Sequence, residues 1–295
     1  MPKVKANGIE LEYESIGDPK NPTILLVMGL GAQLTLWPDD LFAGLAARGF
    51  RVVRFDNRDV GLSSDFESWG TADLPTAVMK VMSGQKVEAP YTLSDMAKDA
   101  VGLLDALGVD KAHVVGASMG GMIAQIVAGK HSERTRSLVS IMSTTGRPGL
   151  PPGKPEAMQA LVQRPPAASD REALVQFSMK LRRTIGSPAY QESDADLRRL
   201  VLRNIERRYF PSGVGRQYLA ILASGHRVDL LKTVTKPTLV IHGADDPLVH
   251  VEGGRDTAKL VAGAELEIYP GMGHDLPAAL VPAHVDRIAR FCARF

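Results

Sequence analysis

The residues of this sequence that could do chemistry stand in three short segments, far apart in the chain. Ser118 lies in residues 116–120, which read GASMG, a G-x-S-x-G pattern. Residues 242–247, HGADDP, supply two carboxylates, and residues 271–274, GMGH, end on a histidine. A serine hydroxyl is a weak nucleophile at neutral pH, so it needs a base, and a carboxylate commonly fixes the tautomer of that base. Together these residue types could carry out acyl transfer through a serine nucleophile.

Each of the three segments follows a run that predicts a strand. The runs cover residues 113–115, 238–241 and 265–269, and an apolar stretch of helix length follows Ser118 at 122–128. A strand, a sharp turn and a helix therefore meet at this serine, and its partners follow in the order aspartate, histidine, as in one known group of serine nucleophiles. The five letters alone would equally describe an ordinary glycine-rich turn. The ordered partners favour the catalytic interpretation.

The chain has seven histidines, and His274 alone combines a position after a strand, flanking glycines and the last place in this order. His113 stands at the wrong end of the strand before Ser118, and His242 is expected to form a hydrogen bond within its own turn. The choice between Asp245 and Asp246 stays open from the residues alone, because Asp245 could instead bond nearby backbone amides. The remaining histidines lack this context; they are His131, His226, His250 and His284.

Acyl transfer also needs hydrogen-bond donors for the oxyanion of the tetrahedral intermediate. One donor is expected from the N–H of Met119, the residue after the nucleophile. The other should come from the turn that follows the apolar strand 23–27, and we assign it to the N–H of Leu30 within residues 28–31, MGLG. Leu30, Met119 and Trp37 could also line the acyl pocket, with simple core packing as the alternative.

Strands and helices alternate along most of the chain, which predicts an α/β fold with a mostly parallel central sheet and helices on both faces. Asn7-Gly8 favours a hairpin turn between two antiparallel edge strands. The expected strands cover residues 3–6, 9–16, 23–27, 51–55, 113–115, 137–142, 238–241 and 265–269. The expected helices outside any insertion cover residues 41–48, 92–107, 253–261 and 281–294.

The composition changes in the middle of the chain. Residues 146–166 are rich in proline and glycine, and no strand separates the helices expected after them, at 170–185, 192–209 and 215–224. We therefore expect a core made of residues 1–145 and 232–295, interrupted by a helical insertion at 146–231.

Charge and cysteine content exclude several classes of partner and site. The 35 basic and 33 acidic residues leave a formal charge of +2, which gives no argument for a nucleic-acid partner. Cys292 is the one cysteine and is expected to pack as a small apolar residue, so we expect no intramolecular disulfide and no cysteine metal cluster. No pair of histidines has the spacing, with an acidic ligand, that suggests zinc, and we expect no metal and no cofactor. Residues 1–8 show no secretory signal, and the uncharged stretch 112–129 predicts a strand and a buried helix, not a membrane span. The expectation is a cytoplasmic monomer or homodimer.

Five segments together resemble the α/β-hydrolase-fold serine esterases over nearly the full length. They are residues 28–31 (MGLG), 56–63 (DNRDVGLS), 116–121 (GASMGG), 242–247 (HGADDP) and 271–274 (GMGH). The resemblance implies Ser118 as nucleophile, Asp246 as acid and His274 as base. It implies that Arg58 and its neighbours form a structural loop beside the oxyanion turn, and that residues 146–231 are the cap that sets substrate choice.

Within that family the chain is most similar to the aclacinomycin methylesterase-like bacterial carboxylesterases. It has Met28-Gly29 where many other relatives have His-Gly, and it lacks the Gly-Gly-Gly oxyanion turn of one lipase group. The resemblance implies hydrolysis of small to medium carboxylic esters, with a small-molecule ester as the partner. The same residues would also serve a lactonase, a perhydrolase (haloperoxidase), a carbon–carbon bond hydrolase or a ligand-binding receptor on this scaffold. A dehalogenase or an epoxide hydrolase would need an aspartate in place of Ser118.

Overall fold

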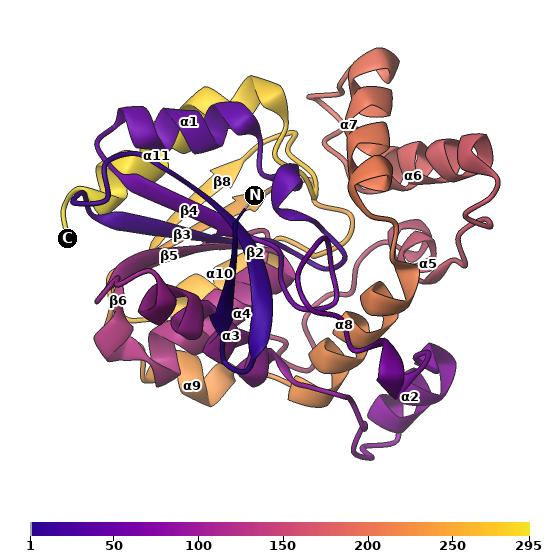
Figure 1. Ribbon diagram of the computed structural model, residues 1–295. Helices are drawn as coiled ribbons and strands as arrows, with labels where there is room; N and C mark the ends of the chain where they lie inside the picture. The colour runs from indigo at the N-terminus through magenta and orange to yellow at the C-terminus, as the bar shows by residue number, and fades with distance from the viewer. Residues whose placement is uncertain (1) are drawn as a thin grey trace.

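A single sheet forms the centre of the computed structural model, which describes residues 2–295 (Figure 1). Met1, the first residue of the N-terminal segment considered above, lies outside the described residues. Within them, eight strands follow the order β1-β2-β4-β3-β5-β6-β7-β8. Strand β2 pairs antiparallel with β1 and β4, and all further pairs are parallel. The strands are β1 (Lys3–Ala6), β2 (Ile9–Ile16), β3 (Thr23–Val27), β4 (Arg51–Phe55), β5 (Ala112–Ala117), β6 (Thr135–Ile141), β7 (Thr238–Gly243) and β8 (Glu265–Tyr269).

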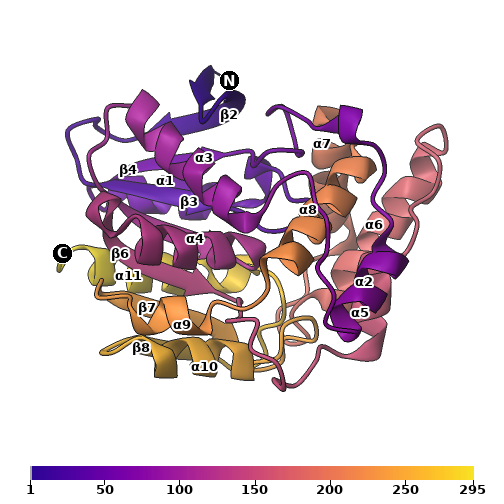
Figure 2. The same cartoon turned by 90° about the horizontal axis from the view of Figure 1, so that it is seen from below.

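Helices cover both faces of this sheet, as Figures 1 and 2 show. Helices α1 (Asp39–Ala47) and α11 (Val281–Cys292) pack together on one face. The other face carries α3 (Leu93–Ala106), α4 (Met119–Lys130), α9 (Val228–Lys232) and α10 (Glu252–Leu260). With both faces covered, β3 and β5 are buried along their whole length, which explains their apolar sequences. The predicted mostly parallel sheet with helices on both faces is confirmed.

The start of α3 illustrates how the sequence sets an element boundary. The side chain of Thr92 accepts a hydrogen bond from the N–H of Asp95, and the carboxylate of Asp95 accepts one from the N–H of Thr92. This reciprocal pair satisfies two N–H groups that the first helical turn cannot bond internally. Thr92 is therefore the N-cap of this helix.

Five helices follow one another between β6 and β7, and the first four lie on the side of the sheet where these strands end (Figure 1). These four are α5 (Pro155–Val162), α6 (Arg171–Ile185), α7 (Asp194–Arg207) and α8 (Pro211–Ser224), and α2 (Leu74–Met82) packs against α8. Helix α5 lies inside the stretch that the sequence suggested as a breaker. Proline is tolerated at the first helical position, because an N–H there would have no partner inside the helix. Pro155 accordingly begins α5. Pro211 begins α8, four residues before the start expected for that helix.

Short 3-10 turns complete the chain at η1 (Leu34–Leu36), η2 (Glu67–Trp69), η3 (Ser132–Arg134) and η4 (Ala278–Leu280). Among residues 2–295, none of the helices combines the length and the apolar character needed to cross a membrane.

Candidate active site

Ser118 occupies the turn between β5 and α4 in a backbone conformation that residues other than glycine seldom adopt. Its φ is 56° and its ψ is −121°. Two hydrogen bonds hold this turn: the Ser118 N–H donates to the carbonyl of Ile141 at 2.9 Å, and the Ser118 carbonyl accepts from Ser143 Oγ at 2.8 Å. Such strain persists when the surrounding structure over-determines it, and it is common where a side chain must be presented to a site.

The glycines of the G-x-S-x-G pattern allow strand, turn and helix to meet. A Cβ atom on Gly116 would lie 2.0 Å from the carbonyl oxygen of Gly120, and one on Gly120 would lie 1.9 Å from that of Val27. Both separations are far below any contact distance and involve backbone atoms that cannot swing away. The two glycines are therefore required by close packing, because neither has a positive φ.

The imidazole of His274 lies between Ser118 and Asp246. Its Nε2 is 2.9 Å from Ser118 Oγ, and its Nδ1 is 2.7 Å from Asp246 Oδ2. An ionised carboxylate can only accept, so Nδ1 donates to Asp246 and Nε2 is left to accept the hydroxyl proton of Ser118. Each of the three residues follows the end of a strand: Ser118 follows β5, Asp246 follows β7 and His274 follows β8. This arrangement lets an imidazole remove a proton from a serine hydroxyl.

Asp246 is buried and is held as an anion. Its Oδ1 accepts the N–H groups of Leu248 at 2.9 Å and Val249 at 2.8 Å. Burial by itself would raise the pKa of this carboxyl, but the charges and hydrogen bonds of His274 and His242 outweigh burial and lower the pKa below its usual range. The carboxylate is thus ready to stabilise a positive charge on His274.

The structure separates the two aspartates between which the residues left a choice. Asp245 is exposed, and its Oδ2 accepts the N–H of Gly271 at 2.8 Å. It therefore links the turn after β7 to the turn after β8, while Asp246 contacts the imidazole of His274. Asp245 does accept a backbone N–H, as expected, but this N–H belongs to a residue 26 positions away and not to its own turn.

The turn after β3 lies directly against the serine. A Cβ atom on Gly29 would approach Ser118 Cβ to 3.1 Å. The N–H of Leu30 has no hydrogen-bond acceptor within residues 2–295. Met119 is the first residue of α4, so its N–H also has no partner inside the helix. These are the two N–H groups expected to face an oxyanion.

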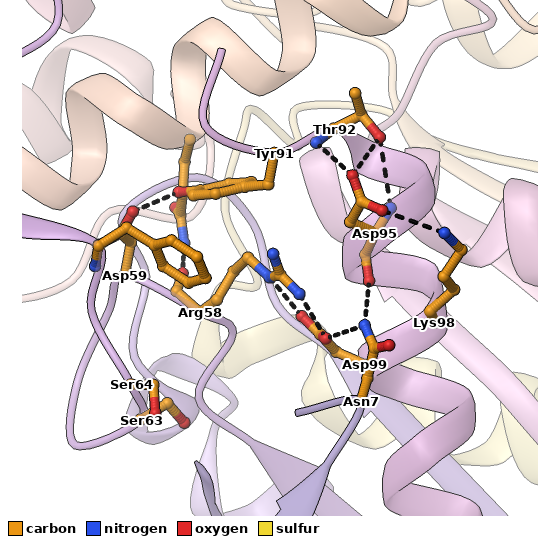
Figure 3. Close-up of polar contacts among 12 residues, drawn as sticks. Asn7, Arg58, Asp59, Ser63, Ser64, Tyr91, Thr92, Asp95, Lys98 and Asp99 are labelled. Atoms are coloured by element: carbon orange, nitrogen blue, oxygen red, sulfur yellow. Dashed lines mark hydrogen bonds and ion pairs between the residues drawn. The ribbon is translucent and has the colours of Figure 1, made fainter. Parts of the chain in front are cut away.

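The loop after β4 supports this turn through a chain of polar contacts. Asn57 Nδ2 donates to the carbonyl of Met28 at 2.9 Å. The guanidinium of Arg58 donates to both carboxylate oxygens of Asp99 at 2.6 Å, and Asp99 also accepts from Asn7 Nδ2 at 2.8 Å (Figure 3). These contacts agree with the structural loop that the family resemblance implies at this position.

A cavity of about 1870 Å³ lies between the core and helices α5–α8, and Ser118 and His274 border it. Ligand pockets commonly enclose about 300–1,000 Å³, so this space is large. Leu30, Met119 and Trp37 line its core side. The side chains that the insertion contributes are largely apolar or aromatic and include Phe177, Leu181, Tyr209, Phe210 and Tyr218.

The remaining histidines and the cysteine have other surroundings. His113 Nδ1 lies 2.8 Å from Ser137 Oγ, His242 Nε2 lies 2.8 Å from the carbonyl of Val249, and His284 is buried. The Cys292 side chain is buried, in line with its expected packing role. Within residues 2–295 no group of three or more histidine, cysteine, aspartate or glutamate side chains could hold a metal ion.

Several contacts by which the insertion reaches these loops have no signal in the sequence. The N–H of His274 donates to the carbonyl of Ile185 at 2.8 Å, and Ser187 Oγ accepts the N–H of Gly273 at 2.8 Å while donating to Asp275. Nothing marks Ser187 in the sequence, because it follows the end of α6 in a segment without a motif. Such contacts join positions about 90 residues apart and become visible only in three dimensions.

The sequence model of the family described as "alpha/beta hydrolase fold" matches residues 22–277. The chain is 29% identical to the rhodomycin D methylesterase DauP of Streptomyces sp. (strain C5), over 97% of this chain and 94% of that protein. Among solved structures, a meta-cleavage product hydrolase of Pseudomonas fluorescens IP01 has a TM-score of 0.78 at 19% identity, covering 100% of this chain and 98% of that one. The enol-lactonase of Burkholderia xenovorans LB400 has a TM-score of 0.74 at 24% identity, with 99% and 100% covered.

Proposed function

Since the chain belongs to the α/β-hydrolase fold family, we propose that it is a serine carboxylesterase in which Ser118 is the nucleophile, His274 the base and Asp246 the acid. The observation that carries this proposal is the geometry of one imidazole. His274 Nε2 lies 2.9 Å from Ser118 Oγ, and Nδ1 lies 2.7 Å from Asp246 Oδ2. Both distances are those of hydrogen bonds. The first places Nε2 to take the hydroxyl proton of Ser118, and the second lets Asp246 hold His274 in the tautomer that can accept it.

The reaction proceeds in two halves through an acyl-enzyme. His274 takes the hydroxyl proton as Ser118 Oγ attacks the ester carbonyl, and the oxyanion of the tetrahedral intermediate accepts the N–H groups of Leu30 and Met119. Collapse breaks the bond to the alcohol, which leaves with the proton from His274. Water then attacks the acyl-enzyme and loses a proton to His274. His274 returns this proton to Ser118 Oγ as the bond to the acyl group breaks and the carboxylic acid departs.

We assign residues 146–231 the role of the cap, because helices α5–α8 form the wall of the cavity opposite Ser118. The apolar and aromatic lining suits a carboxylic ester with a sizeable apolar portion. The likeness to a rhodomycin D methylesterase supports ester hydrolysis, with methyl esters among the first substrates to examine.

The test is hydrolysis of p-nitrophenyl acetate by the wild-type chain and by Ser118→Ala. Removing the nucleophile should lower kcat by about 10⁴-fold or more while the circular dichroism spectrum stays unchanged. Ser132→Ala is the matched control, because Ser132 lies in η3 at the opposite end of the parallel strands. It should keep wild-type turnover. Full activity in Ser118→Ala would end the proposal.

The same two proteins allow the type of ester to be found. A series of methyl esters, lactones and p-nitrophenyl esters of increasing acyl length should be turned over repeatedly by the wild-type chain only. A common acyl-enzyme predicts a burst of p-nitrophenol with good leaving groups. Binding of these compounds with no more than one turnover would instead indicate a receptor on a hydrolase scaffold.

A further inference from the structure

Gln217 of α8 connects the insertion to the turn that carries Leu30. Its side chain is fully buried. Its Oε1 accepts the N–H of Gly31 at 2.8 Å, and its Nε2 donates to the carbonyl of Arg58 at 2.7 Å. A single side-chain amide on α8 therefore bridges two loops of the core. Its oxygen and its nitrogen each have a hydrogen-bond partner.

The bond to Gly31 fixes the peptide unit next to the proposed oxyanion donor. Because a peptide unit is planar, holding the N–H of Gly31 also sets the carbonyl carbon of Leu30, which lies two bonds from the Leu30 nitrogen. Gly31 has a φ of 65°, and a Cβ atom there would lie 2.9 Å from Val214 Cγ2 on the same helix. The turn thus packs directly on α8 at Gly31, where a glycine leaves no side chain to hold the peptide unit.

The other end of the Gln217 amide rests on a rigid support. Arg58, whose carbonyl accepts the bond, has its guanidinium held by both oxygens of Asp99. Asp99 is held in turn by Asn7 from the turn between β1 and β2, as Figure 3 shows. A continuous set of hydrogen bonds therefore runs from the first hairpin through α3 and the loop after β4 to Gln217.

From these contacts we infer that Gln217 is a positioning residue for the oxyanion hole: it holds the 28–31 turn so that the N–H of Leu30 faces the reacting carbonyl. The inference rests on the proposed esterase function. The amide does not touch the substrate, and it acts through the placement of a backbone donor. Such a donor stabilises the transition state, in which the oxyanion charge develops, and adds little to the binding of the uncharged substrate.

The first variant is Gln217→Met, which keeps the size of the side chain and removes both hydrogen bonds. Losing an oxyanion donor outright costs about 10²–10³-fold in kcat, so a displaced donor should cost about 10–100-fold, with KM changed by less than about threefold. Binding of a boronic acid, which forms a tetrahedral adduct with a serine, should weaken by a similar factor. Inhibition by the carboxylate product should stay as in the wild-type chain.

A conservative variant separates positioning from packing. In Gln217→Glu, burial favours the protonated carboxyl, which can accept from Gly31 and donate to the Arg58 carbonyl. Its kcat should therefore lie closer to the wild-type value than that of Gln217→Met, and its deficit relative to wild type should grow as the pH rises. A structural role alone would give both variants the same deficit at every pH.

Tyr91→Phe is the matched control for a lost buried hydrogen bond. The Tyr91 hydroxyl donates to Asp59 Oδ2 at 2.7 Å, in the loop that Gln217 contacts but away from residues 28–31. This variant should lose stability and keep the wild-type kcat and boronic acid affinity.

The outcomes distinguish this inference from the proposed function. If the wild-type chain hydrolyses esters and Ser118→Ala does not, a kcat of folded Gln217→Met within twofold of wild type overturns the inference alone, as does a change confined to KM. If Gln217→Met fails to fold, Gln217→Glu decides, because a kcat deficit of this variant that does not change with pH would overturn the positioning role. Failure of the wild-type chain to hydrolyse any ester would overturn the proposed function instead.

Discussion

His242 Nε2 lies 3.5 Å from Asp246 Oδ2, so a second imidazole stands beside the carboxylate that contacts His274. The same nitrogen lies 2.8 Å from the carbonyl of Val249, which can only accept, so Nε2 carries the proton. The positive end of this N–H dipole thus faces both oxygens. The position of His242 gives Asp246 a polar neighbour that does not compete for the Ser118 hydroxyl.

Asp246→Asn should leave the fold intact and lower kcat by about 10⁴-fold, because an amide can present its donor to Nδ1 and leave His274 in the wrong tautomer. The measurement is kcat on p-nitrophenyl acetate, with circular dichroism to confirm folding. Asp245→Asn is the matched control and should remain within a few-fold of wild type, since exposed Asp245 contacts Gly271. A larger loss in Asp245→Asn than in Asp246→Asn would reverse the assignment of the acid.

Gly120→Ala should prevent the chain from folding to a soluble protein. The added Cβ would lie 1.9 Å from the carbonyl oxygen of Val27, and neither backbone segment can move without breaking the sheet. The cost should exceed about 4 kcal/mol, the range reached only by severe core disruption. Gly263→Ala is the control, because it has a φ of 74° but open space around it and should cost about 1–2 kcal/mol. Equal soluble yields of the two variants would contradict this explanation.

The ion pair between Arg216 and Asp59 joins α8 to the loop after β4, and both side chains are fully buried. Arg216→Met should destabilise the protein by about 3–5 kcal/mol, because it leaves a buried carboxylate without its cation. Adding Asp59→Asn should restore a large part of that loss, since asparagine tolerates the φ of 65° at this position. Urea unfolding of both single variants and the double variant measures the coupling. Strict additivity of the two changes would show that the pair does not act as a unit.

His284 makes stability depend on mild acid. It is fully buried against the ring of Tyr269, and neither of its ring nitrogens has a hydrogen-bond partner within residues 2–295. Burial lowers the pKa of His284 to about 4, against about 6.5 in an unfolded chain. Between these values the unfolded chain binds a proton that the folded protein does not, so the free energy of unfolding falls as the pH drops from about 6.5 to 4.

His284→Leu should therefore flatten this dependence without destabilising the protein at pH 7. The full shift corresponds to about 3 kcal/mol, and His113, whose pKa burial also lowers to about 4, supplies a second contribution that remains in the variant. Urea unfolding at several pH values between 7 and 4 gives both slopes. Identical slopes in the wild-type chain and the variant would refute the assignment to His284.

The strands and the three segments that follow them could be predicted because their signals are local. An apolar run such as 23–27 or a G-x-S-x-G pattern predicts its local structure within a few residues. Parallel strands end at the same edge of a sheet, so the segments that follow them are expected to lie close together. The bounds of helices α5–α8 were harder to predict. Pro155 and Pro211 begin helices, although proline in isolation suggests an interruption.

The contacts of Gln217, Ser187 and Ile185 could not be predicted, for a different physical reason. Each joins a side chain or carbonyl of the insertion to a backbone group of the core between 86 and 186 residues away in the chain. Every residue except proline carries the same backbone N–H and C=O groups, so the residue type does not indicate which backbone group a distant side chain will bond.

The insertion is hydrogen-bonded to the core at the segments that carry the proposed catalytic residues. The carbonyl of Ile185 accepts the N–H of His274, the Gln217 amide accepts that of Gly31, and the N–H of Lys154 donates to the carbonyl of Pro247, next to Asp246. A change in substrate range therefore puts different demands on different parts of the insertion. We expect the helix faces toward the cavity to tolerate substitution, and these few junctions to tolerate little, because the junctions also hold the turns of the proposed site. A chimera that receives a relative's cap should remain active only if it also receives matching junctions.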